Sequence, residues 1–446
     1  MTENSAEAVF PRNFAVRYPS AVRGEGSYLF DETGKKYLDA CGGAAVVTIG
    51  HGVPEIIKQI AERALPLPYV HSSQFHTRVG KELASLVASR FPGDPQHVRV
   101  YFTSGGSEAT ETAIKIVRQY WLSRGQPQRY KILSRWHSYH GTTLGALALS
   151  GNLRRRKPYE PFLPEMGHIS ACFCYRCPLQ LTYPACELAC AHELEAAIAK
   201  AGKDTVAAFI LEPVVGATNG AVPPEGYLRT ISEICHRNNI LLLDDEVLTG
   251  AGRTGRYFAV EHWNVVPDLI LLGKGLSSGY APLGAVLVAE KVWRTIQTGS
   301  GTLEHGFTYQ EHPPSLAAGL AVQRYLEEHR LVERARQQGD YCARRVAELR
   351  TLPCVGDVRG LGLLWSVEFV ADRDPRTPFP LERRLVERLF EKLRERGVLV
   401  YPMRGTADGV AGEHIMLAPP FIIEKAELDF LVREIREAIT QVSREL

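Results

Sequence analysis

The sequence has almost no net charge and no long hydrophobic run. Its 52 lysines and arginines are balanced by 50 aspartates and glutamates, so a formal charge of +2 offers no field that would attract nucleic acid or an anionic membrane. No apolar stretch approaches the roughly 20 residues that a membrane-spanning helix needs. The N-terminus, MTENSAEAVFPRNF, has no basic segment followed by an apolar one, so no secretory signal is predicted. We therefore expect a cytoplasmic globular protein without nucleic-acid or membrane partners.

Cysteine is also scarce, and its distribution argues against a disulfide scaffold. The nine cysteines are an odd number, and most stand singly. Five of them gather in one stretch, CFCYRCPLQLTYPACELAC, at Cys172, Cys174, Cys177, Cys186 and Cys190. Their spacing matches no standard metal site. A structural zinc ion or iron–sulfur cluster, small buried residues in a compact loop, and free thiols all stay open, and no catalytic metal is expected.

Short apolar segments alternate with helical patterns along the chain, which predicts an α/β fold with a mostly parallel central sheet covered by helices. The expected strands are 98–102, 130–135, 206–213, 240–247, 268–273 and 284–290. The expected helices are 107–120, 186–201, 226–238, 315–349, 382–396 and 424–444.

The chain is too long for a single hydrophobic core, and its two ends differ from its middle. An early stretch, 26–50, has the pattern of a small antiparallel meander, and the last hundred residues mix strands with helices. We expect a large central domain over 76–320. A smaller α+β domain is then built from 1–75 and 321–446.

The first of four suggestive strand ends is TSGGSEATETAIK, residues 103–115. Two glycines, Gly105 and Gly106, turn the chain into a helix that Ser107 opens. The free N–H groups of a first helical turn suit a phosphate. An ordinary glycine turn with Ser107 as N-cap is the alternative. No G-K-[ST] follows, so this is not a nucleotide P-loop.

Two further strand ends carry an aromatic residue and a buried acid. In WHSYHGTTLGA, residues 136–146, Tyr139 or His140 could stack on a flat ring. The alternative is a packed aromatic residue and a hydrogen-bonded histidine without a ligand. In LLLDDEVLTG, Asp245 ends a strongly apolar strand. A buried carboxylate needs a cation or donors, which a protonated pyridine nitrogen would supply. A helix cap or a metal ligand is the alternative.

The fourth strand end is Lys274, between two glycines in LILLGKGLSSG. A lysine amine becomes a nucleophile and forms Schiff bases when desolvation lowers its pKa. The same lysine could instead bind a phosphate as a point charge. A phosphate loop, a stacking aromatic, a pyridinium partner and a Schiff-base lysine together are the requirements of pyridoxal 5'-phosphate. Asp245 would keep the ring nitrogen protonated, and Lys274 would carry the cofactor and shuttle the substrate proton.

With these motifs in order, nearly the whole chain resembles the class III pyridoxal-phosphate aminotransferases, which have the fold type I architecture. The matching segments are SGGSEATETAIKIVR, SYHGTTLGAL, EPVVGA, LLLDDEVLTGAGRTG, GKGLSSGYAPLGA and HGFTYQEHP. The resemblance implies a catalytic Lys274 and Asp245, and cofactor contacts from Gly106, Ser107, Tyr139, His140, Glu212 and Val247. It also implies that Thr308 reaches the phosphate of a neighbouring subunit, and hence a homodimer with active sites at the interface.

Two departures from the family pattern bear on the substrate. Met416 stands where many members carry a carboxylate-binding arginine, and Ala217 stands where those members carry the paired glutamate. The segment YPMRGTADGVAGEHIMLAPPF resembles the ω-transaminases instead. This resemblance implies an amine or ω-amino acid donor and a 2-oxo acid acceptor such as pyruvate, with Arg404 as the carboxylate anchor.

Several other interpretations stay open. A lyase, decarboxylase or aminomutase with the same cofactor would share these motifs. The G-x-G-x-x-G of residues 250–255 could instead mark a nicotinamide-dependent dehydrogenase, although that function leaves Lys274 unexplained. A binding protein without catalysis would not need both Lys274 and Asp245. The basic run RRRK, residues 154–157, is interpreted as solvated surface, and binding of an acidic substrate is the alternative.

Overall fold

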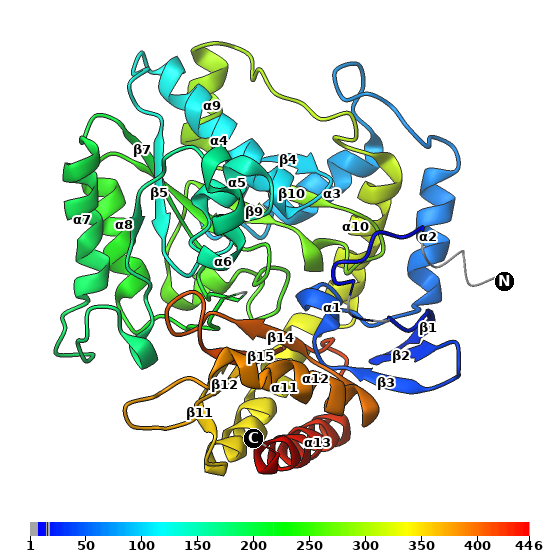
Figure 1. Cartoon of the computed structure of the whole chain (residues 1–446). Helices are drawn as coiled ribbons and strands as arrows, with labels where there is room; N and C mark the ends of the chain where they lie inside the picture. Colours follow the sequence, from blue (N-terminus) through cyan, green and yellow to red (C-terminus); the bar gives the residue numbers. More distant parts are fainter. Residues whose placement is uncertain (1–7, 15, 17, 217, 446) are drawn as a thin grey trace.

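The computed structural model describes residues 8–14, 16, 18–216 and 218–445. Figure 1 shows a large layered part above a smaller part in which both ends of the chain take part. The strands form three sheets, one of seven strands and two of four. Within the described residues, no helix is long and apolar enough to cross a membrane.

The seven-stranded sheet contains all six predicted strands, in the order β4-β10-β9-β8-β7-β5-β6. The bounds are β4 Arg99–Thr103, β5 Lys131–Arg135, β6 His168–Ile169, β7 Val206–Leu211, β8 Leu241–Asp245, β9 Leu269–Leu272 and β10 Gly284–Val288. Strands β5 to β9 are parallel, whereas β10 runs antiparallel to β4 and to β9. Every residue of β7 to β10 is buried, as expected for a sheet covered on both faces.

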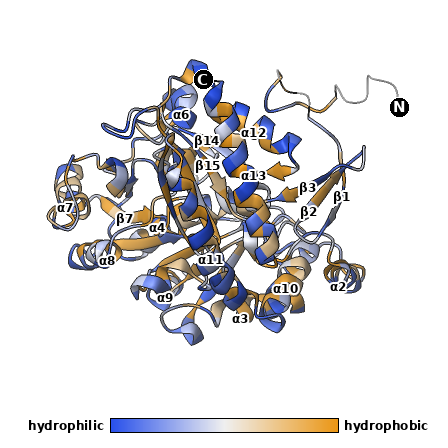
Figure 2. Cartoon of the chain, turned by 90° about the horizontal axis from the view of Figure 1, so that it is seen from below, coloured by the Kyte–Doolittle hydropathy of each residue, from blue (hydrophilic) through white to orange (hydrophobic). Residues whose placement is uncertain are grey.

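Helices pack on both faces of this sheet, and in Figure 2 their hydrophobic stripes turn inward while the outer faces are hydrophilic. These helices are α3 Arg78–Ala88, α4 Gly106–Ser123, α5 Leu144–Leu149, α6 Leu153–Arg156, α7 Ala189–Ala201, α8 Tyr227–Arg237 and α9 Glu290–Thr298. Helix α7 begins later than the predicted residue 186, because Glu187 and Leu188 adopt left-handed backbone angles.

The single helix predicted over 315–349 is wrong. Two helices occupy this stretch, α10 Pro313–Glu328 and α11 Leu331–Ala347, and Arg330 breaks them apart with a φ of 49°. The two helices serve different cores. Leu316 and Leu320 of α10 pack in the core of the large sheet, whereas Leu326 and the residues of α11 pack in the core of the small part. Helix α10 therefore bridges the two cores.

Both chain ends build the small part. Strand β13 Val398–Leu399 pairs in parallel with β3 Lys36–Asp39 and extends the N-terminal meander that was predicted. The remaining elements are α1 Gly42–Ala45, α2 Pro54–Ala64, β1 Ala21–Glu25, β2 Tyr28–Asp31, β11 Val355–Leu361, β12 Leu364–Phe369, β14 Tyr401–Arg404, β15 Glu413–Leu417, α12 Leu385–Glu395 and α13 Lys425–Arg444. This pairing supports a division into 1–75, 76–320 and 321–446, which stays a prediction.

The glycine-rich loop of residues 250–255 does not have the strand–turn–helix context of a dinucleotide site. Only a 3-10 turn, Ala259–Trp263, follows it before β9. Arg253, inside the loop, is fully buried and donates hydrogen bonds to the backbone oxygens of Val47, Leu363 and Pro419. The loop therefore ties the large sheet to the small part, and the dehydrogenase interpretation loses its motif.

Candidate active site

The four suggestive strand ends meet at one edge of the large sheet, beyond the carboxyl ends of its parallel strands. They enclose a cavity of about 160 Å³. The lining residues are Gly106, Ser107, Tyr139, His140, Gly141, Glu212, Asp245, Val247, Leu248 and Lys274. All of the predicted cofactor residues except Thr308 therefore lie around one space.

Lys274 follows β9 at the start of a 3-10 turn, Lys274–Leu276, and lines the cavity. Its φ of 41° lies in the left-handed region, a conformation that a non-glycine residue adopts only when its surroundings compensate. Burial lowers the pKa of its amine to about 8, although the charges of Asp245 and Glu212 act in the opposite direction. The amine is therefore far easier to deprotonate than an exposed lysine.

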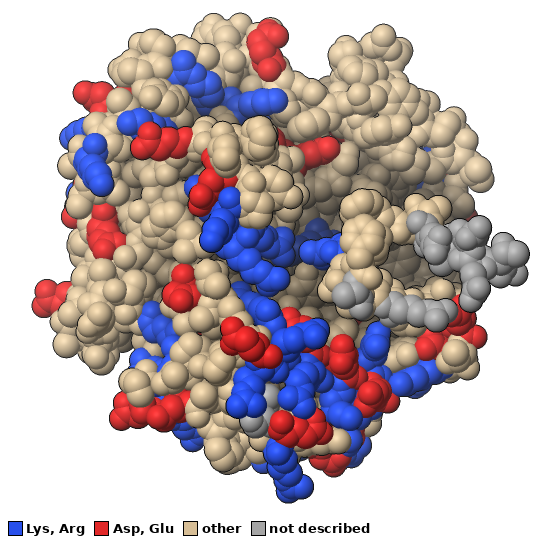
Figure 3. Space-filling model, viewed as in Figure 1, with Lys and Arg blue, Asp and Glu red and all other residues tan. Residues whose placement is uncertain are grey.

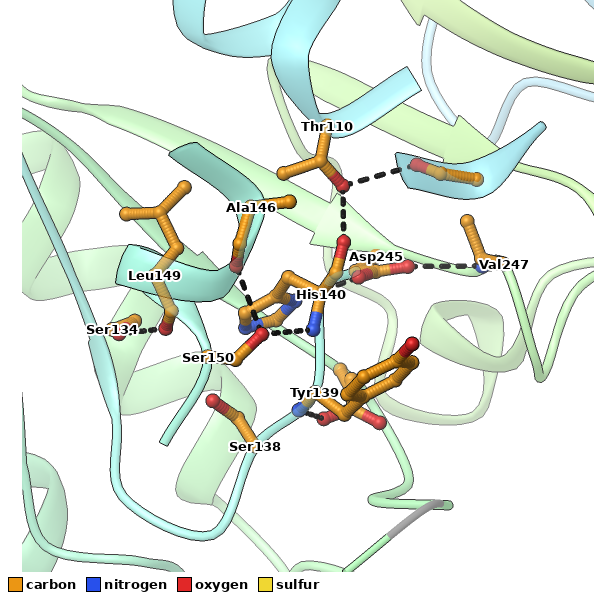
Figure 4. A network of polar contacts seen from close by, with 12 residues as sticks. Thr110, Ser134, Ser138, Tyr139, His140, Ala146, Leu149, Ser150, Asp245 and Val247 are labelled. Carbon is orange, nitrogen blue, oxygen red and sulfur yellow. Dashed lines mark hydrogen bonds and ion pairs between the residues drawn. The ribbon is translucent and has the colours of Figure 1, made fainter. Parts of the chain in front are cut away.

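Asp245 ends β8 and is buried against His140 (Figure 4). Its Oδ2 lies 2.6 Å from Nδ1 of His140, and its Oδ1 accepts the N–H of Val247 at 3.1 Å. The main chain of His140 is held in turn, because its N–H donates to Ser150 and its carbonyl accepts from Thr110. The histidine is thus held against Asp245 and lines the cavity with it.

Tyr139 and Glu212 form one wall of the cavity. Oε1 of Glu212 accepts the backbone N–H of Tyr139 at 2.9 Å, and Figure 4 shows the phenol ring beside this contact. Burial raises the pKa of Glu212. The buried Arg135 donates to the carbonyl of Glu212 at 2.6 Å and holds the turn after β7 against β5. The aromatic face is thereby positioned by two strand ends.

The opposite wall is the N-terminus of α4. Its N-cap residue, Gly105, makes no side-chain capping hydrogen bond, so N–H groups of the first turn stay available to an anion. Backbone must pass close here, since a Cβ on Gly106 would lie 2.7 Å from Cγ1 of Val247. The hydroxyl of Ser107 accepts the N–H of Thr142 and faces the same cavity.

These observations fit pyridoxal phosphate in three respects. The uncapped first turn of α4, the buried acid Asp245 and the aromatic ring of Tyr139 line one cavity. The amine of Lys274 enters from β9. Gly106 and Gly273 leave the space between these groups free, because a Cβ at either position would crowd Val247. The chemistry and the placement of the donor set therefore match the cofactor that the sequence predicts.

Three residues predicted to bear on substrate or partner lie outside the cavity. Thr308 is exposed, and its carbonyl accepts from the hydroxyl of Tyr69. Arg404 lies on β14 and forms ion pairs with Glu413 and Glu387. Met416 is buried in an apolar cluster with Leu248 and Val214. Ala217 lies outside the described residues.

Within the described ranges of the chain, the thiols of the cysteine-rich connection are not gathered into a group that could hold a metal ion. Among the described residues, the groups of three whose ligand atoms lie within 4.8 Å of one another comprise Asp94, His97 and Glu290, and none includes a cysteine. All nine thiols are free, and Cys172 is buried. A larger cavity of about 1040 Å³ borders this connection at Cys174 and Cys177. It shares no lining residue with the cavity of Lys274.

Three neighbours of the site were missed from the sequence. Gly141 and Leu248 line the cavity and flank residues that were predicted. The third is Arg155, whose guanidinium lies 4.5 Å from the centroid of the Tyr139 ring. It belongs to the basic run interpreted as solvated surface. That run follows Tyr139 closely in the sequence, and this closeness could have identified Arg155 as a neighbour of the site.

The chain matches a known family over most of its length. The model of the family described as Aminotransferase class-III matches residues 12–439. The uncharacterized aminotransferase YodT of Bacillus subtilis is 39% identical over 431 residues, which cover 96% of each chain. The putrescine–pyruvate aminotransferase of Pseudomonas aeruginosa is 32% identical over 425 residues, covering 95% of this chain and 90% of its own.

A solved structure shares the whole architecture. The ω-transaminase of Pseudomonas jessenii in complex with PMP superposes with a TM-score of 0.91 at 31% identity. The match covers 98% of this chain and 96% of that one. The fold is therefore that of the fold type I transaminases, as the sequence predicts.

Proposed function

The chain belongs to the class-III aminotransferase family, whose members depend on pyridoxal phosphate, and on that premise we propose its substrates and the roles of its residues. It transfers an amino group from an amine or ω-amino acid to a 2-oxo acid such as pyruvate, in a ping-pong cycle. The observation that carries this proposal is that Lys274, Asp245, Tyr139 and Ser107 line one cavity.

Pyridoxal phosphate supplies an aldehyde that condenses with amines and a ring that withdraws the electron pair released at the substrate carbon. Around it, the first turn of α4, with Gly106 and Ser107, would bind the phosphate. Asp245 would keep the ring nitrogen protonated, with His140 holding the carboxylate in place. Tyr139 and Val247 would pack against the ring, and Glu212 would close the wall.

Lys274 is the catalytic residue that attaches the cofactor and then moves the proton. Its lowered pKa allows a neutral amine to exist near neutral pH, which the proton abstraction requires. Its position at the end of β9 allows the freed amine to reach the substrate carbon from inside the cavity.

An amine donor is supported by the apolar surroundings of Met416. The cluster of Met416, Leu248 and Val214 offers no charge for a second carboxylate on the donor. The relative from Pseudomonas aeruginosa is named for putrescine and pyruvate, a diamine and a 2-oxo acid. Arg404 was expected to anchor the acceptor, and this role requires it to leave Glu413 and Glu387.

A homodimer with shared active sites completes the proposal. Thr308 is exposed rather than directed into its own cavity, which suits a residue that serves a partner's phosphate. The upper right of the molecule, near α2 and α3, carries few charged side chains in Figure 3. Large apolar residues are exposed on neighbouring loops, among them Leu65, Leu67, Phe75 and Tyr309. A cytoplasmic location stays a prediction of the sequence.

A donor panel tests the function. Purified protein is assayed with alanine, β-alanine, 4-aminobutyrate, putrescine and 1-phenylethylamine, each against pyruvate and 2-oxoglutarate. We expect at least one amine to yield the matching aldehyde or ketone together with alanine. Release of ammonia or carbon dioxide in place of alanine would favour the lyase or decarboxylase interpretation. Lys274→Ala should lose both the visible absorption and the activity.

A further inference from the structure

The acceptor of the proposed reaction carries a carboxylate, and the residue expected to hold it is already occupied. Arg404 donates from Nε to Glu413 at 3.1 Å, and its other end pairs with Glu387. Two carboxylates already balance this single guanidinium. A substrate carboxylate would have to break a part-buried pair and leave an acid without its cation, which is costly.

A second arginine, Arg155, lies within electrostatic reach of the reacting amine. The guanidinium of Arg155 lies 4.5 Å from the centroid of the Tyr139 ring, and Tyr139 lines the cavity of Lys274. The positive charge of Arg155 contributes, after burial, to the lowered pKa of Lys274, so the two cations are within electrostatic reach. Burial raises the pKa of the Tyr139 phenol, and the charge of Arg155 opposes this rise.

Arg155 has no carboxylate partner within the part of the chain that the structure describes. Among the residues that the structure describes, its guanidinium makes the ring contact with Tyr139 and forms neither a hydrogen bond nor an ion pair. An arginine stacked on an aromatic face keeps its N–H fork free for a planar anion. This side chain is therefore available where Arg404 is not.

The short helix α6 is fixed so that Arg155 faces Tyr139. The side chain of Asn152 accepts the backbone N–H of Arg155 at 3.1 Å. Arg156 donates to the backbone oxygens of Leu147, Ala148 and Ser150 and so ties α6 to the end of α5. Such fixation lowers the entropy cost of holding a ligand.

The charged side chains next to Arg155 on α6 are also positive. Arg154 lies within α6 and Lys157 follows it, and both are exposed. Figure 3 shows lysine and arginine side chains gathered at the centre of this face, over the region of α6 in Figure 1. The mouth of the cavity therefore attracts an anion, although the net charge of the chain is near zero.

We propose that Arg155 binds the carboxylate of the 2-oxo acid acceptor and thereby sets the specificity of that half-reaction. The inference rests on the proposed transamination. The guanidinium donates two parallel hydrogen bonds to the carboxylate oxygens, while the keto carbon points toward Lys274. An amine without a carboxylate makes no such contact and binds through the apolar side of the site. One cavity thus accepts two unlike substrates.

The test separates binding from turnover. Propionate, a carboxylate without an amine or keto group, is titrated into the holoenzyme by calorimetry, and the KM values for pyruvate and 1-phenylethylamine are measured beside it. Arg155→Leu should weaken propionate binding and raise the KM for pyruvate by roughly 10- to 100-fold, the loss expected for a charge-assisted pair. The KM for the amine should stay near that of the wild type.

Three variants complete the design. Arg155→Lys should fall between wild type and Arg155→Leu, because a lysine keeps the charge without the fork. Arg154→Leu, the exposed neighbour, should behave as wild type. Unchanged propionate affinity in Arg155→Leu, or the same loss in Arg404→Leu alone, would overturn the inference. If no donor reacts in the wild type, the proposed function fails, whereas the propionate titration still decides the role of Arg155.

Discussion

Nδ1 of His140 and Oδ2 of Asp245 lie 2.6 Å apart beneath the cavity, in a place closed to solvent. The two residues come from different strand ends, after β5 and at the end of β8. The other carboxylate oxygen, Oδ1 of Asp245, accepts the backbone N–H of Val247 in the turn that follows β8. The carboxylate is therefore oriented by its surroundings before any ligand enters.

Substitutions in this pair should reduce the rate of transamination to different degrees. Asp245→Asn should lower kcat/KM by roughly 100- to 1000-fold, because a neutral amide cannot supply the electrostatic stabilisation of the ring nitrogen that the proposal assigns to Asp245. His140→Phe should lower it by roughly 10- to 100-fold, the range seen when a group that orients a functional ligand is lost. His140→Asn keeps a donor near Nδ1 and should lose less. Steady-state kinetics with one donor at fixed pH measure all three, and equal rates in His140→Phe and wild type would contradict the role.

The buried amine of Lys274 should make the stability of the cofactor-free protein depend on pH. Its folded pKa of about 8 lies below the ordinary 10.5, so the unfolded chain binds more protons between these values and stability rises with pH there. Below pH 8 the full cost of burying the charge applies. Lys274→Met should therefore raise the melting temperature at pH 7, and this gain should vanish above pH 10.5.

A matched lysine controls this experiment. Lys203 is exposed, so Lys203→Met should leave the melting temperature of the cofactor-free protein unchanged across the same range. Scanning calorimetry of the three proteins at several pH values provides the comparison. A gain in Lys274→Met that stays constant with pH would show that packing, rather than charge, is responsible.

The glycines at the start of α4 should differ in their tolerance of a methyl group. A Cβ on Gly106 would approach Val247 to 2.7 Å, whereas a Cβ on Gly105 would meet nothing within 4 Å. The backbone of Gly105 is extended, with a φ of 174°, and any residue can adopt it. Gly106→Ala should weaken pyridoxal phosphate binding by about tenfold, in line with the cost of overpacking, and Gly105→Ala should not.

Relief of the clash gives an internal check on the Gly106 prediction. The double variant Gly106→Ala with Val247→Ala should recover part of the lost affinity, because the crowding methyl groups are gone. Titration of the cofactor-free variants, followed by visible absorption, measures the affinity. The losses of pyridoxal phosphate binding free energy in the two single variants can be added and compared with the loss in the double variant. A loss in the double variant larger than this sum would argue against crowding as the cause.

Hybrid dimers test whether Thr308 serves the partner subunit. Thr308→Asp should repel a phosphate, and Lys274→Ala removes the reacting amine, so each homodimer should be inactive or nearly so. A hybrid of the two chains contains one complete site if Thr308 crosses the interface, and it should recover roughly half of the wild-type activity per dimer. Co-expression with two different tags yields the hybrid. No recovery would place Thr308 in its own subunit's site.

Much of the site was predictable because each part is local in the sequence. The buried run before Asp245, the glycines around Lys274 and the glycine turn before Ser107 each mark a strand end or a helix start. In parallel sheets these ends lie at one edge, so the shared cavity follows from topology. The break at Arg330 was less accessible, because hydrophobic periodicity continues across it from α10 into α11. Only the presence of two cores explains that break.

By itself, the sequence determined the fold class, the family and most of the residues that line one cavity, since these depend on local patterns kept in order along the chain. The tertiary structure decided which partners the side chains have. It paired His140 with Asp245, occupied Arg404 with Glu387 and Glu413, and left Arg155 free beside Tyr139. The physical reason is that an arginine's role depends on which charges lie within a few ångströms, and residues distant in sequence provide those charges.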